Sequence, residues 1–169
     1  MIIEFKCKDK RARCTYKQWD FCKAYFAKKT ILYIKKLINE YLNNTIVLNE
    51  SDHYEDLNMI LNFFNDDYIE NIDLKDENQY EIFYKKCINV FKSFNDTLIY
   101  FDIGGINVIL EKEDYEGCFS KGNTYDIILL FKDVLDDIEE DLETHKSFII
   151  EFYRLCIYSV KEQQKILIT

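Results

Sequence analysis

Residues 97–112 constrain the fold of this chain most strongly, because they place a Gly104-Gly105 pair between two apolar, β-branched runs. Two-residue hairpin turns of the primed types require φ > 0, which glycine adopts without steric cost. With the pair as a turn, one face is apolar and consists of Ile99, Phe101, Ile103, Ile106, Val108 and Leu110. The other face, apart from Ile109, is polar and consists of Tyr100, Asp102, Asn107 and Glu111. The stretch therefore predicts a β-hairpin with one buried and one solvated face.

The N-terminus predicts a further strand. Over residues 1–8, Ile3, Phe5 and Cys7 alternate with more polar neighbours, which is the period-2 pattern of a half-buried strand. A turn at Asp9-Lys10 leads to a short returning strand over residues 11–14.

Helical patterns fill most of the remaining sequence, which has no proline and only four glycines. Cap residues at Thr15, Asp52, Asp76 and Asn123 each precede apolar residues at three-to-four spacing. The predicted helices cover residues 16–43 (with an optional break at 28–30), 53–65, 77–94, 123–143 and 147–161. Residues 45–48 fit either a small strand or a loop. Residues 125–131 also fit a third strand beside the hairpin, but the apolar stripe continues past Phe131 and favours a helix.

These elements together predict an α+β fold. A small antiparallel sheet is built on the Gly-Gly hairpin, joined by the strand over residues 1–8, and covered by four to six helices. The length of 169 residues predicts a single domain spanning 1–169.

Charge is distributed unevenly along the chain. Residues 1–36 contain 11 Lys and Arg against three acids, a formal charge of +8, whereas residues 37–169 carry −17 and the whole chain −9. The basic segment, with Tyr16, Trp19 and Tyr25 interleaved, has residue types that contact phosphates and stack on bases. However, the acidity of the whole molecule opposes the approach of a polyanion, so direct nucleic-acid binding is disfavoured.

No catalytic motif stands out. The chain lacks a nucleophile elbow, a phosphate-binding glycine loop and a zinc-binding cysteine pattern. The six cysteines form no C-x-x-C pair and are predicted to be reduced thiols of a cytoplasmic protein, with no signal peptide or membrane span. We therefore predict a non-enzyme without a cofactor or metal. Cys118, which follows Gly117 in a polar loop, is the candidate if the chain is instead a cysteine-based enzyme.

Carboxylates form the candidate binding site. Seven acids lie between Asp133 and Glu143, and further acids lie between Asp52 and Asp73. On one continuous helix, Asp133, Asp136, Asp137 and Glu140 would form a ridge at i, i+3, i+4 and i+7. A hard cation prefers such oxygens, but a solvated helix face is the commoner use. The predicted partner-binding residues are Asp133, Asp136, Asp137, Glu140, Asp141 and Glu143, together with the polar hairpin face of Tyr100, Asp102, Asn107 and Glu111.

Small size, concentrated negative charge and the lack of a catalytic constellation favour one functional class. We expect a non-enzymatic binding protein that inhibits a basic, nucleic-acid-processing protein. Examples are an immunity protein against a nuclease toxin and a phage-encoded inhibitor of the anti-CRISPR type. The alternatives are a homodimerising adaptor or scaffold domain, which pairs the basic and acidic ends, and an enzyme with an unrecognised cysteine-based site.

Overall fold

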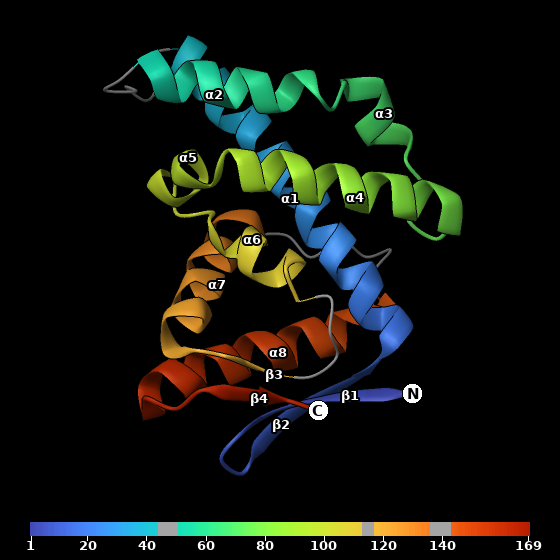
Figure 1. Cartoon of the computed structure of the whole chain (residues 1–169), viewed down its shortest axis with the longest axis vertical. Helices are drawn as coiled ribbons and strands as arrows, with labels where there is room; N and C mark the ends of the chain where they lie inside the picture. The colour runs from blue at the N-terminus through green and yellow to red at the C-terminus, as the bar shows by residue number, and fades with distance from the viewer. Residues whose placement is uncertain (44–50, 113–116, 136–142) are drawn as a thin grey trace.

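The computed structural model describes residues 1–43, 51–112, 117–135 and 143–169, and it has an α+β fold. A four-stranded antiparallel sheet lies at one end of the molecule and helices α2, α3 and α4 lie at the other (Figure 1). The strands are β1 (Ile2–Cys7), β2 (Lys10–Thr15), β3 (Gly117–Phe119) and β4 (Ile166–Ile168). The helices are α1 (Tyr16–Leu42), α2 (Ser51–Asn62), α3 (Asp66–Asn71), α4 (Glu77–Ser93), α5 (Asn95–Tyr100), α6 (Gly105–Leu110), α7 (Lys121–Val134) and α8 (Glu143–Glu162).

The sheet is built on the N-terminal hairpin, in the order β2-β1-β4-β3. The predicted N-terminal strand and its returning strand are confirmed, with Phe5 opposite Ala12 and Ile3 opposite Cys14. The turn between them is Lys8-Asp9 and not the predicted Asp9-Lys10. The C-terminal strand β4 pairs with β1 and β3, and all pairs are antiparallel. Alternation places Ile3, Phe5 and Cys7 on the inner face. The outer face is solvated, as is common for one face of an antiparallel sheet.

Helix α8 covers the inner face of the sheet, and an aromatic cluster joins the two layers. The ring centroid of Phe5 lies 4.9 Å from that of Trp19 and 5.0 Å from that of Phe152. All three side chains are buried. Trp19 belongs to α1, which begins at the predicted capping box of Thr15 and Gln18 and leads from the sheet towards the far end (Figure 1). The cluster therefore fixes α1 and α8 to the sheet.

The predicted Gly-Gly hairpin is wrong. Residues 95–110 form two short helices, α5 and α6, and Gly104 has helical angles of φ −63° and ψ −19°. A Cβ added at Gly105 would lie 2.3 Å from the backbone oxygen of Asp126 in α7, closer than atoms can approach. The glycine is thus required by the contact between α6 and α7, and not by a turn. The bend between α5 and α6 falls at Asp102, whose φ of 60° is left-handed.

Several helix predictions need smaller corrections. The described residues contain eight helices, and not four to six. Helix α1 runs through residues 28–30 without a break, and α2 begins at Ser51, before the predicted cap. Helix α7 is capped by Ser120 and not by Asn123, although its helical assignment over residues 125–131 is confirmed. The prediction for residues 45–48 lies outside the described residues. Within them, no helix is long and apolar enough to cross a membrane.

Candidate functional site

The predicted acidic ridge does not lie on one helix. Helix α7 ends at Val134, and Leu135 follows with non-helical angles of φ −114° and ψ 31°. The sequence that follows is rich in acids, and acidic residues disfavour the C-terminal end of a helix, where the helix dipole is already negative. Asp133 is half-buried in the last turn of α7, and Glu143 is the first residue of α8. The other predicted ridge residues lie outside the described residues: Asp136, Asp137, Glu140 and Asp141.

The four residues predicted for the polar hairpin face do not form one surface. Tyr100 ends α5, and its ring stacks on His53 of α2 with 3.9 Å between centroids. Asn107 is buried and donates hydrogen bonds to the Phe91 carbonyl oxygen (2.9 Å) and to Asn95 Oδ1 (2.8 Å). Asp102 and Glu111 are exposed, at the bend before α6 and at its C-cap. Asn107 therefore holds α6 to α4 and α5 and is unavailable to a partner.

A stronger negative surface lies on α2, α3 and the start of α4. Between Ser51 and Glu81 the sequence has ten acids and a single basic residue, Lys75. We define the acidic helical surface by the acidic side chains in this range that are exposed to solvent. They are Glu55, Asp66, Asp67, Glu70, Asp73, Asp76, Glu77 and Glu81. It lies at the end of the molecule opposite the sheet (Figure 1).

Some acids in this range have roles within the fold. Asp66 forms an ion pair with Lys35 of α1 at 2.9 Å, Asp76 caps α4, and the half-buried Asp56 accepts a 2.6 Å hydrogen bond from Thr97 Oγ1. By contrast, Glu55 and Glu70 make no hydrogen bond or ion pair with any described residue. These two carboxylates are free to meet a cation from another molecule.

Two exposed apolar side chains lie on α2 and directly after it, in the same segment as Glu55. Met59 is 49% exposed and Phe63 is 46% exposed, although the opposite side of α2 is buried through Leu57 and Ile60. Met59 lies one helical turn after Glu55, so the two side chains share a face of the helix. Exposed methionine and aromatic side chains with a charged rim are typical of protein interfaces. The acidic helical surface therefore offers apolar anchors as well as charge.

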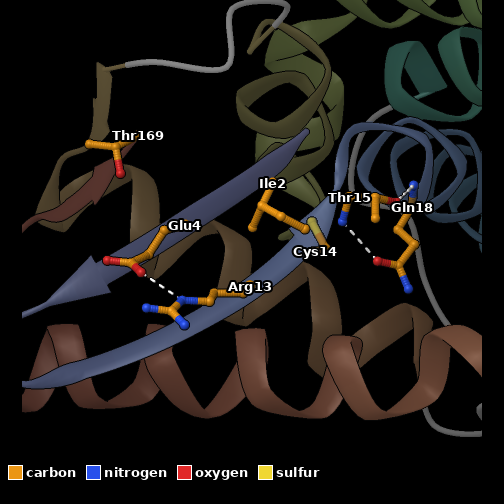
Figure 2. A pocket seen from close by; sticks show the side chains of 7 residues that line it. All are labelled: Ile2, Glu4, Arg13, Cys14, Thr15, Gln18 and Thr169. Carbon is orange, nitrogen blue, oxygen red and sulfur yellow. Dashed lines mark hydrogen bonds and ion pairs between the residues drawn. The ribbon is translucent and has the colours of Figure 1, made fainter.

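The outer face of the sheet has the opposite charge. Lys6, Arg11 and Arg13 project from β1 and β2, and Arg13 donates a 2.7 Å hydrogen bond to Glu4. This bond is the main reason that the pKa of Glu4 is lowered. Figure 2 shows the open depression beside this pair, which also contains Gln18. Gln18 accepts a hydrogen bond from the backbone of Thr15, so the polar groups lining the depression are largely used within the fold.

The cysteines differ sharply in accessibility. Burial raises the pKa of the Cys14 thiol to about 12, and burial also raises the pKa of Cys7, Cys22, Cys87 and Cys156. Only Cys118, in β3, is partly exposed, and all six are free thiols.

We expect one thiol of the native protein to react quickly with a disulfide reagent, because thiolates react and buried thiols stay protonated. Cys118→Ser should remove this fast reaction, whereas all remaining thiols should react after unfolding. The measurement is a time course of the thiol that the reagent releases as it reacts with the protein, with and without denaturant. Two or more fast thiols in the native protein would contradict the burial of the other five.

The described residues contain no group of three or more His, Cys, Asp or Glu arranged to hold a metal ion. Comparisons of the chain with protein-family models, with curated proteins and with solved structures give no match. The functional argument therefore rests on the surfaces of this chain.

Proposed function

We propose that this protein is a non-enzymatic binding protein that inhibits a basic, nucleic-acid-processing protein through its acidic helical surface. The observation that carries the proposal is that two carboxylates, Glu55 and Glu70, make no bond with a described residue and belong to a surface of eight exposed acids. Immunity against a nuclease toxin and inhibition of a host defence nuclease are the two forms of this function.

The physical basis is charge complementarity. Proteins that process nucleic acids carry Lys and Arg clusters that bind phosphates. An array of carboxylates is negatively charged like the phosphates and therefore attracts the same clusters. Complementary charge accelerates association, and desolvated apolar anchors then slow dissociation. Met59 and Phe63 are placed to act as such anchors beside Glu55.

A second candidate is the homodimerising adaptor. It is supported by the opposite charges of the sheet end and the acidic helical surface, which would attract one another between copies. Sedimentation at low and high salt separates the two candidates: a salt-sensitive oligomer favours the adaptor, and a monomer at both salt concentrations favours the inhibitor.

A growth-rescue assay tests the inhibitor. Cells producing a nuclease toxin, or carrying a plasmid targeted by a CRISPR effector, are supplied with this protein, and the genes neighbouring its own decide which nucleases are tried first. We expect the wild type to restore growth or plasmid retention against at least one of them. The double variant Glu55→Lys/Glu70→Lys should lose this protection.

Glu111→Lys/Glu151→Lys is the matched control. It changes the net charge by the same amount at exposed positions outside the acidic helical surface. It should protect as well as the wild type. Equal loss of protection in both variants would show that only net charge matters, and failure of the wild type against every nuclease tried would reject the proposal.

A further inference from the structure

Among the residues that the structure describes, strand β2 is an edge of the sheet whose only neighbouring strand is β1. The two strands are joined by the two-residue turn Lys8-Asp9. The turn is held to α8, because Lys8 pairs with Glu162 at 3.0 Å and Tyr158 donates a hydrogen bond to Asp9. These two contacts fasten the turn end of the six-residue edge to α8.

The register identifies the backbone groups on this edge. Cys7 and Lys10 flank the two-residue turn as a hydrogen-bonded pair. From there, non-hydrogen-bonded and hydrogen-bonded pairs alternate along the hairpin. The N–H and C=O groups of Arg11, Arg13 and Thr15 consequently point away from β1. The Thr15 N–H, for example, is bound by the side chain of Gln18 at 2.8 Å. The backbone groups of Arg11 and Arg13 have no partner among the described residues.

A groove lies between the Lys10–Arg11 end of β2 and α8. Its lining includes Leu155 and Tyr158 of α8 together with Arg154 and Glu151, and Lys10 and Arg11 close it on the side of the strand. Ala12, between the two arginines, is buried and small. Four cations, Lys10, Arg11, Arg13 and Arg154, lie here with three carboxylates, Glu4, Asp9 and Glu151. Glu4 pairs with Arg13 at 2.7 Å and with Arg11 at 3.7 Å, so an incoming acidic segment shares these two arginines with Glu4.

We propose that the edge of β2 binds an extended acidic segment of another protein by strand addition. Acidic residues at positions i and i+2 of that segment lie opposite Arg11 and Arg13 on the outer face. An apolar residue between them enters the groove beside Leu155. Backbone hydrogen bonds supply part of the affinity and the alternating side chains supply specificity.

A second copy of this chain is the wrong occupant. Antiparallel pairing of two β2 edges joins the outward-pointing residues of one copy to those of the other. Every such register that uses Arg11 and Arg13 of both copies places an arginine directly opposite an arginine. Like charges in directly opposed positions are destabilising, whereas carboxylates there are favourable.

The probe is a capped, fluorescently labelled peptide in which glutamate and valine alternate. We expect it to bind, and to protect the Arg11 and Arg13 amides from hydrogen exchange measured by NMR. A permuted peptide, with the same composition but contiguous glutamates, should bind at least about fivefold more weakly, since it presents acids to both faces.

Two substitutions at one position separate charge from backbone pairing. Arg13→Gln removes the guanidinium, whereas Arg13→Pro also removes the N–H, and proline is tolerated on the free side of an edge strand. Arg13→Pro should therefore weaken binding about fivefold more than Arg13→Gln, the effect of one hydrogen bond. If Arg13→Pro does not fold, Arg11→Glu provides the decisive variant and should weaken binding at least tenfold.

Three results would overturn the proposal. The alternating peptide fails to bind, it binds without protecting the two amides, or the permuted peptide binds equally well. In each case the arginines would only protect the edge strand against aggregation, or attract anions without the formation of a new strand pair. The test is independent of the acidic helical surface, which lies at the opposite end of the molecule.

Discussion

Gly105→Ala is expected to lower the free energy of unfolding by about 3 kcal/mol, since overpacking of a rigid contact costs about this much. The added Cβ would lie 2.3 Å from the carbonyl oxygen and 2.7 Å from the carbonyl carbon of Asp126. Both atoms belong to the backbone of α7, so no side-chain rotation relieves the clash and α6 must move away. Denaturant unfolding followed by circular dichroism gives the difference.

The other helical glycines provide graded controls. At Gly104 the nearest atom is Ile99 Cγ1 at 2.6 Å, in a side chain that is 55% exposed, and the nearest backbone atom is Ile99 Cα at 3.3 Å. Because the clash is with a side chain at the surface and not with backbone, Gly104→Ala should cost less. At Gly122 the nearest atom is 3.9 Å away, and alanine in this exposed helical position should stabilise the protein by about 0.5 kcal/mol. Equal effects at all three positions would contradict the close approach of α6 to α7.

The wrong prediction of a Gly-Gly hairpin shows that one stretch of sequence can fit both a strand pattern and a helix pattern. The buried residues Ile103, Ile106 and Leu110 also fit a helical spacing of i, i+3 and i+7, and the strand interpretation placed the same three residues on its apolar face. What decides between them is the contact of α6 with α7, which no local pattern contains. The N-terminal strands and the capping box at Thr15 were predictable because their signals are local.

The two shortest strands were beyond sequence analysis for a related reason. Strands β3 and β4 have three residues each, too few to show a period, and they are defined by pairing with residues far away in the chain. The acidic helical surface was partly predictable, since charge between Asp52 and Asp73 is evident in the sequence. Its anchors were not, because an exposed Met59 or Phe63 has the same sequence signal as a buried one.

The second large effect concerns binding. Glu55→Lys/Glu70→Lys should slow association with a basic partner at least tenfold at low salt, because it replaces two attractions by two repulsions on the contact surface. Stability should change little, since both side chains are exposed and make no bond with a described residue. High salt should reduce the difference in association rate between the variant and the wild type, because ions screen exposed charges beyond about 8–10 Å.

Association rates measured by stopped flow, with the nuclease identified by growth rescue, test the central claim most directly. We predict that the wild type and the control Glu111→Lys/Glu151→Lys associate at similar rates at low salt. Glu55→Lys/Glu70→Lys should then be at least tenfold slower and should converge with them at high salt. Identical low-salt rates for all three proteins would contradict the claim that the acidic helical surface is the contact.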